Sequence, residues 1–82
     1  MLKRQTIAIK DIYVPVKRRA TLNAATVRGI AESMLEKGQE TPILVRPDGE
    51  RYVLVEGLHR LEACKELGDQ TIVSYLVQAR RH

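Results

Sequence analysis

Near the start of the chain, a segment of alternating polar and apolar residues is followed by a segment with no regular pattern. Residues 6–10 alternate between polar and apolar side chains, which predicts a strand with one buried face. Pro15 interrupts any continuation of that strand, because proline has no N–H to donate to a β-ladder. Residues 17–22 are rich in basic side chains, and we predict a loop there.

A helix is predicted over residues 23–37. Four apolar residues recur at the spacing of one helical face: Val27, Ile30, Ala31 and Met34. Asn23 is a suitable N-cap, since its side-chain oxygen can accept a hydrogen bond from an amide of the first turn. Gly38 is a suitable end, because helices often stop at a glycine in the left-handed conformation.

Two apolar runs, at residues 43–46 and 52–55, predict a β-hairpin. The residues between them, Pro-Asp-Gly-Glu at 47–50, are typical of a turn. Both runs are nearly continuous, and we therefore expect both faces of these strands to be covered.

The rest of the chain predicts a helix over residues 58–67 and a last strand over residues 71–77. The element order is then β-α-β-β-α-β, which indicates a small α+β domain with a mixed sheet. A length of 82 residues suits one domain with one core, and we expect residues 1–82 to form it. The composition, 44% hydrophobic and 29% charged, is that of a globular rather than a disordered chain.

Charge and residue types narrow the possible functions. The net charge of +4 favours an anionic partner such as a nucleotide or nucleic acid. The single cysteine, Cys64, excludes an internal disulfide, and together with two histidines it leaves no ligand set for a metal. Three tyrosines are too few for a stacking platform for single-stranded nucleic acid. Without an apolar run that could span a membrane or act as a signal peptide, we expect a cytoplasmic protein with no membrane partner.

The junction between the second hairpin strand and the next helix is the most informative segment. The first amides of a helix have no carbonyl partner within it, and the helix dipole adds positive potential there. A phosphate could bind at this point, because Gly57 has no Cβ to block its approach to the backbone. Arg60 could donate two parallel hydrogen bonds to phosphate oxygens, and His59 offers another donor.

Each of these residues also has a structural alternative. Gly57 could simply turn the chain, and His59 could be a solvated surface residue. Arg60 could pair with Glu62 or Glu66. The sequence contains neither a Walker motif nor GxGxxG, so neither nucleotide-binding fingerprint supports the phosphate interpretation.

The same junction and its surroundings resemble the ParB/sulfiredoxin superfamily. Three segments within residues 27–77 carry the resemblance: Lys37-Gly38-Gln39 followed by Thr41-Pro42-Ile43-Leu44-Val45-Arg46, then Glu56-Gly57-Leu58-His59-Arg60-Leu61-Glu62-Ala63, then Leu67-Gly68. The joint spacing of the three is far more specific than any one of them.

The resemblance implies a nucleotide-binding domain that holds the triphosphate of ATP or CTP, and it leaves Mg²⁺ open as a companion ion. The phosphates would lie at Gly57-Leu58-His59-Arg60. The connector at residues 39–42, with Thr41 and Pro42, would lie near the base or sugar. An arginine of the basic segment would face the phosphates, and Arg18 and Arg19 are both candidates.

The branches of the superfamily differ around Leu58. Sulfiredoxin is similar through Gly57, His59 and Arg60 but carries a reactive cysteine where this chain has Leu58, which argues against sulfinic-acid reductase activity. ParB partition proteins carry Glu-Arg-Arg at positions 58–60, and only the last Arg is retained here.

The free amino-acid kinases have an acidic residue just before the shared motif, and Glu56 matches that position. Glu56 is therefore a candidate catalytic residue, which could accept a proton from a hydroxyl or hold Mg²⁺. As a structural residue it could instead pair with Arg60 or cap the following helix.

Three functions follow from these observations. We favour a stand-alone ParB-like module that binds a nucleotide and acts in regulation or in DNA-associated assembly, related to plasmid partition, through a DNA-binding partner protein. The first alternative is a small Mg²⁺-dependent ATPase or kinase-like phosphotransferase that uses Glu56. The second is a protein that binds DNA directly through Arg18, Arg19 and its other basic residues. The sequence is also compatible with a homodimer.

Overall fold

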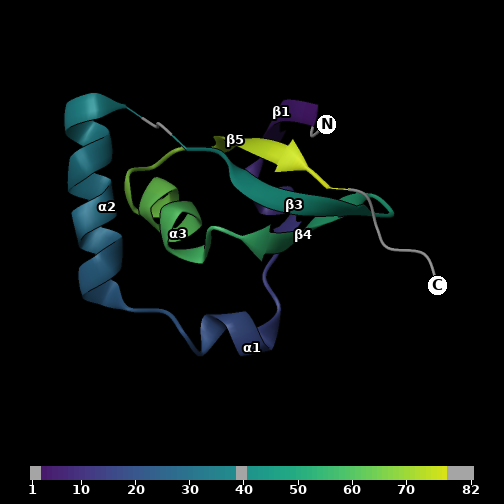
Figure 1. Cartoon of the computed structure of the whole chain (residues 1–82), viewed down its shortest axis with the longest axis horizontal. Coiled ribbons are helices and arrows are strands. Elements are labelled where there is room, and N and C mark those ends of the chain that lie inside the picture. The colour runs from purple at the N-terminus through teal and green to yellow at the C-terminus, as the bar shows by residue number, and fades with distance from the viewer. Residues whose placement is uncertain (1–2, 39–40, 78–82) are drawn as a thin grey trace.

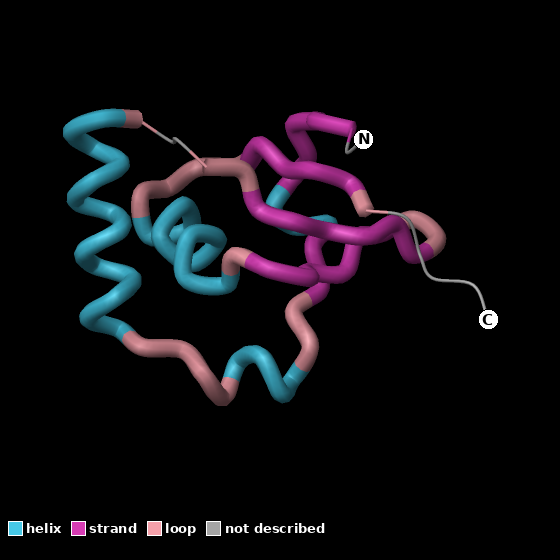
Figure 2. Tube along the Cα trace, in the orientation of Figure 1, coloured by secondary structure: helices cyan, strands magenta, loops and turns pink. Residues whose placement is uncertain are grey.

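The structure, a computed structural model, describes residues 3–38 and 41–77. These residues form a mixed five-stranded sheet in the order β1-β5-β3-β4-β2. The strands are β1 (Lys3–Ala8), β2 (Ile12–Tyr13), β3 (Ile43–Asp48), β4 (Arg51–Glu56) and β5 (Thr71–Leu76). The pairs β1–β5 and β3–β4 are antiparallel, whereas β2–β4 and β3–β5 are parallel. The predicted α+β fold with a mixed sheet is therefore confirmed (Figure 2).

The helices lie mainly to one side of this sheet. They are the 3₁₀ helix η1 (Ile9–Asp11) and the α-helices α1 (Val16–Arg19), α2 (Ala24–Lys37) and α3 (Leu58–Glu66). In Figure 1, α3 lies between α2 and the strands, and α1 lies at the margin of the molecule. The order of layers is thus sheet, α3 and α2, with the hydrophobic core between them.

The long helix α2 follows the predicted pattern closely. The Oδ1 of Asn23 accepts a hydrogen bond from the N–H of Thr26 at 3.1 Å, which confirms the predicted N-cap. At the other end, Gly38 has a φ of 79° and its N–H donates to the Met34 carbonyl at 2.7 Å. Val27, Ala31 and Met34 are buried along the predicted apolar stripe.

Three short elements were not predicted. The 3₁₀ helix η1 occupies Ile9–Asp11, so the first strand ends at Ala8 and does not extend over residues 9–10 as predicted. Strand β2 contains only two residues and is recognisable by its parallel pairing with Tyr52 and Val53 of β4. Helix α1 occupies part of the predicted loop at residues 17–22, and it begins after Pro15, whose carbonyl accepts the N–H of Arg18 at 2.9 Å. No residue of α1 is buried, so it leaves no apolar periodicity in the sequence.

The first strand of the hairpin, β3, is fully covered on one face only. Ile43 and Val45 are buried beneath α3, while Leu44 between them is half-buried. The neighbouring β5 repeats this pattern, with Ile72 buried and Val73 half-buried. In β4, by contrast, the consecutive residues Val53 and Leu54 are both buried. Because consecutive residues of a strand point to opposite faces, the expectation that both faces are covered holds for the middle of β4 and was wrong for β3.

Met34 provides a test of the packing of α2. We expect Met34→Ala to lower the free energy of unfolding by about 2–5 kcal/mol, because it leaves a cavity in the core cluster. The neighbouring Leu35 is 73% exposed, and Leu35→Ala should change the stability by less than about 0.5 kcal/mol. Urea denaturation measures both values. Equal effects of the two substitutions would show that the Met34 face is not packed as described.

Candidate functional site

Gly57 joins β4 to α3 in a conformation and a space that both require glycine. Its φ of 110° lies in the region that L-residues with side chains rarely adopt. A Cβ at this position would lie 2.6 Å from Cγ2 and 2.9 Å from Cβ of Ile43, far inside van der Waals contact. The bend between strand and helix therefore lies directly against β3, and Gly57 does more than turn the chain.

The first turn of α3 presents amides that the helix itself does not use. The first intrahelical hydrogen bond runs from the N–H of Leu61 to the carbonyl of Gly57 at 2.9 Å. The amides of Leu58, His59 and Arg60 precede it, and no side chain of the described residues caps this end. These amides and the positive end of the helix dipole form an arrangement that favours an anion.

His59 connects this turn to the start of α2. Its Nε2 accepts a hydrogen bond from the backbone N–H of Asn23 at 3.0 Å. In a capping box this N–H would be bound by a Glu or Gln at the position of Thr26, which cannot serve in that way. The imidazole supplies the missing acceptor from the neighbouring helix. A neutral His59 must then carry its proton on Nδ1, which is the nitrogen left to donate to a ligand.

Arg60 is half-buried in the same turn. Neither of the ion pairs considered for it, with Glu62 or with Glu66, is formed in the described part of the chain. Glu62 is bound instead by Lys65, whose Nζ lies 3.1 Å from its Oε2. Arg60 therefore forms no ion pair among the described residues.

The remaining predicted residues lie on both sides of this bend. Glu56 is exposed at the end of β4, directly before Gly57, and forms no ion pair among the described residues. Thr41 is exposed and Pro42 is half-buried, and both immediately precede the Ile43 that contacts the bend. Gln39 of the predicted connector lies outside the described residues.

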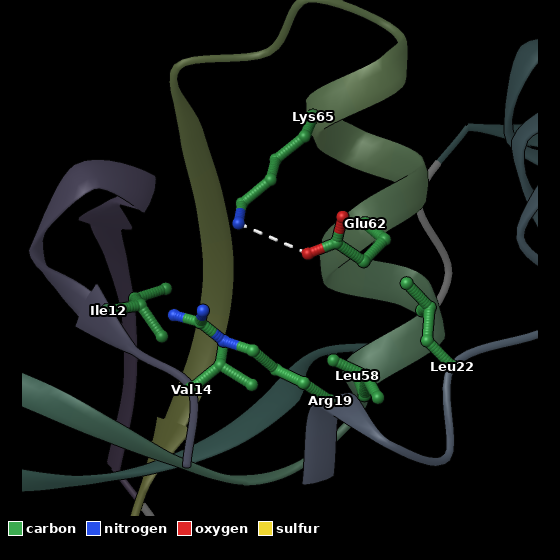
Figure 3. A pocket seen from close by; sticks show the side chains of 7 residues that line it. All are labelled: Ile12, Val14, Arg19, Leu22, Leu58, Glu62 and Lys65. Carbon is green, nitrogen blue, oxygen red and sulfur yellow. Dashed lines mark hydrogen bonds and ion pairs between the residues drawn. The ribbon is translucent and has the colours of Figure 1, made fainter. Parts of the chain in front are cut away.

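Arg18 and Arg19 belong to α1, and the structure separates their surroundings. Arg19 lines a hollow of about 340 Å³ between α1 and α3, whereas Arg18 does not. Leu58 and Val14 form part of the wall of this hollow, and Lys65 reaches its edge from α3 (Figure 3). Leu58 thus faces this hollow at the position where sulfiredoxin is expected to carry its cysteine.

Cys64 is buried one turn and a half further along α3 and has no exposed surface. Burial raises the pKa of the Cys64 thiol to about 11, and the charge of Asp69 and a hydrogen bond to its carboxylate act in the same direction. A thiol held in its neutral form is a poor nucleophile. Cys64 therefore packs as a small hydrophobic residue.

Two negative findings apply to residues 3–38 and 41–77. No three side chains of His, Cys, Asp or Glu gather there in a way that could hold a metal ion. No helix in that part of the chain is long and apolar enough to cross a membrane.

The neighbours of the predicted motif were not identifiable from the sequence. Ile43 behind Gly57, the Asn23 amide bound to His59, and the pair Glu62–Lys65 all contribute to this region. Only Asn23 carried a signal, and that signal indicated a helix cap rather than a contact between helices.

Comparison with known protein families identifies the family to which this chain belongs. The model of the ParB N-terminal domain family matches residues 2–82. This chain belongs to that family. None of the curated proteins matches it in sequence.

Solved structures share the fold of this ParB N-terminal domain. Sulfiredoxin from Arabidopsis thaliana superposes with a TM-score of 0.83 at 25% identity, over 94% of this chain and 86% of its own. ParB from Caulobacter crescentus, complexed with CTP-γ-S, has a TM-score of 0.81 at 26% identity, over 95% of this chain and 46% of its own. A free serine kinase in complex with AMP has a TM-score of 0.78 at 21% identity, over 90% of this chain and 30% of its own. The domain therefore spans less than half of the ParB and kinase structures that it matches.

Gly57 allows the bend to be tested by a matched pair of substitutions. Gly57→Ala adds both a strained φ and the clash with Ile43, whereas Gly68→Ala adds only the strained φ of 82°, since nothing lies within 4 Å of its Cβ position. We expect Gly68→Ala to cost about 1–3 kcal/mol of unfolding free energy and Gly57→Ala to cost clearly more. Thermal denaturation compares the two. Equal losses would mean that β3 does not press against the bend.

The buried thiol of Cys64 should make the free energy of unfolding depend on pH. Its thiol has a pKa of about 11 in the folded protein against an ordinary value of 9.0, so the folded state holds the proton more tightly. The contribution of Cys64 to stability should be complete below pH 9.0 and should be lost as the pH rises through about 11. Urea denaturation of the wild-type domain and Cys64→Ala over this range isolates it, because other groups titrate equally in both. Parallel pH profiles would contradict a buried, protonated thiol.

Proposed function

We propose that this ParB N-terminal domain binds a nucleoside triphosphate, with the phosphates against the first turn of α3. The observation that carries the proposal is the uncapped helix start beyond Gly57, where the amides of residues 58–60 precede the first intrahelical bond. A phosphate there gains hydrogen bonds from these amides and the field of the helix dipole together. The complex of the related ParB from Caulobacter crescentus with CTP-γ-S supports a nucleotide as the ligand.

The side chains around this turn have distinct proposed roles. Arg60 binds phosphate oxygens through its two parallel N–H donors. His59 donates through Nδ1, and its bond to the amide of Asn23 orients the ring. Arg18 and Arg19 add positive charge from α1, a helix that itself contains no acidic residue.

The base would lie on the side of the connector before β3. Thr41 and Pro42 are the described residues of that connector, and Ile43 joins them to the bend at Gly57. ATP and CTP both remain candidates, because the chain has Leu58-His59 where ParB partition proteins carry Glu-Arg. Mg²⁺ in such sites is usually held by one or two carboxylates together with the phosphates, and Glu56 is the carboxylate next to the bend.

A titration followed by amide chemical shifts tests the proposal. We expect ATP or CTP, with or without Mg²⁺, to shift the amides of residues 58–60 saturably at millimolar concentration or below. Arg60→Ala should weaken this binding by about tenfold or more, since a charge-assisted bidentate contact is lost. Arg51→Ala removes the same charge from the start of β4, at the end opposite to Gly57, and should leave the affinity unchanged.

The outcomes also separate the alternative functions. If no nucleoside triphosphate perturbs residues 58–60, the proposal fails. Phosphate release or transfer that disappears in Glu56→Gln while binding persists would establish the phosphotransferase alternative. Binding to DNA without nucleotide, which weakens steeply with salt and on substitution of Arg18 and Arg19, would establish direct DNA binding.

A further inference from the structure

We infer that the face of the sheet turned away from α3 is a protein interaction surface, and that it takes an acidic amphipathic helix of a partner protein. In Figure 1, α2 and α3 lie on the same side of the strands. The opposite side of the sheet is called the outer face below. The inference goes beyond nucleotide binding and does not depend on it, because it uses none of the residues proposed to hold the nucleotide.

Alternation along the strands and the strand register identify the residues of the outer face. Ile43, Val45 and Ile72 belong to the core cluster beneath the helices, so the residues next to them in each strand point the other way. Residues directly opposite each other in neighbouring strands share a face, and Tyr75 lies opposite both Leu44 and Arg4. The residues assigned to the outer face in this way include Arg4, Leu44, Arg46, Val73 and Tyr75.

The outer face is apolar along β5 and beside it. Val73 and Tyr75 of β5 and Leu44 of β3 are half-buried, and each keeps part of its side chain in contact with solvent. Val77 continues this row, because its N–H donates to a carbonyl of β3 at 2.8 Å. On β4 the outer face is closed, since Val53 is only 6% exposed there. These four half-buried residues, Leu44, Val73, Tyr75 and Val77, are called the apolar strip.

The strand arrangement favours a helix as the cover of this strip. The strip lies on β3 and β5, which are a parallel pair at the centre of the sheet. Parallel strands are usually covered on both faces, and helices are the usual cover. Among the described residues, α2 and α3 cover one face of this pair only. A helix from a partner would complete the arrangement and remove the strip from water.

Two arginines on the outer face determine the charge of the partner helix. Arg4 of β1 and Arg46 of β3 lie on the two sides of β5, and neither forms an ion pair among the described residues. Two strand spacings separate β1 from β3 by about 10 Å, which is about the diameter of an α-helix. A helix lying along β5 would therefore have one flank near each arginine, where glutamate or aspartate side chains can pair with them.

The acidic residues of the neighbouring strands do not cancel these charges. Asp48, at the end of β3, is bound by Arg51 at 3.1 Å. Glu56 lies on β4, which is two strands away from β5. The strip is thus apolar in its centre and positive on both sides, which complements a helix with an apolar stripe between two acidic flanks.

Two other occupants fit this surface less well. A second copy of the chain would bring Arg4 and Arg46 close to the same arginines of its partner, and like charges in contact disfavour association. Single-stranded nucleic acid needs several free aromatic rings for its bases. Arg51 already lies over the ring of Tyr13, 4.4 Å from its centroid, and Tyr52 packs against the core, which leaves only Tyr75.

A designed peptide of about 15 residues, long enough for the strip of about 13 Å, tests the surface. It carries leucines along one helical stripe, glutamates on both flanks and alanines elsewhere. We expect it to shift the backbone amides of Val73 and Tyr75 saturably at neutral pH and low salt. The same peptide with glutamine in place of every glutamate, and a scrambled peptide of unchanged composition, should each bind at least about tenfold more weakly. No shift with the designed peptide, or equal binding of the glutamine peptide, would overturn the inference.

Substitution of the two arginines tests the charge contacts from the side of the domain. Arg4→Gln and Arg46→Gln together should weaken peptide binding by about tenfold, because both flanking cations are lost. Arg28→Gln removes the same kind of charge from an exposed position of α2, on the other side of the sheet, and should leave the affinity unchanged. Equal affinities of all these variants would contradict the proposed contacts.

The same amides distinguish the other occupants. If an oligothymidylate shifts Val73 and Tyr75 and binds more tightly than the peptide, the surface belongs to nucleic acid and the inference is wrong. If the two amides shift on concentrating the domain alone, a second copy covers the face and the inference is equally wrong. Triphosphate binding is read from the amides of residues 58–60 instead, so failure of one proposal leaves the other intact.

Discussion

The contact between Gly57 and Ile43 determines where the candidate site lies. Ile43 is 1% exposed and belongs to β3, the middle strand of the described sheet. Because no Cβ fits between the two residues, the end of β4 and the start of α3 are fixed relative to the centre of the core. The amides of the first turn of α3 are therefore held by the most deeply packed part of the fold, although they lie at its surface.

Two helix starts meet at this point. The bond from the Asn23 N–H to His59 brings the N-terminus of α2 beside the first turn of α3. Both helices point the positive ends of their dipoles toward the same region, and the basic residues of α1 lie nearby in the chain. The exposed acidic residues of α2, Glu32 and Glu36, lie in its second half, away from this end. The fold thus gathers positive potential at one corner without a cluster of lysines or arginines on one helix face.

The similarity to sulfiredoxin and to ParB shows how little the backbone determines the chemistry here. The two structures superpose on this domain almost equally well, with TM-scores of 0.83 and 0.81. In this domain the residue after the bend is Leu58, which lines the hollow between α1 and α3. The only thiol, Cys64, is buried and held protonated. A shared fold therefore leaves the chemistry of this domain to its own side chains.

Local patterns in the amino-acid sequence were sufficient for the main elements of the fold. The spacing of Val27 and Met34 predicted α2, and Asn23 and Gly38 marked its ends, because these signals act within one or two helical turns. The glycine bend before Arg60 was visible for the same reason. Local patterns could not identify β2 or α1, since β2 exists only through pairing with a distant strand and α1 buries nothing.

The contacts that shape the site were beyond the reach of such patterns. Asn23 and His59 are 36 residues apart in sequence, and Ile43 meets Gly57 only after β3 and β4 have paired. The hollow likewise forms only where Arg19 of α1 comes opposite Lys65 of α3. Periodicity records which face of an element is apolar, but not which distant side chain that face will meet. The packing of the whole chain decides which distant side chains meet. That packing gives the motif around Gly57 its defined shape and charge.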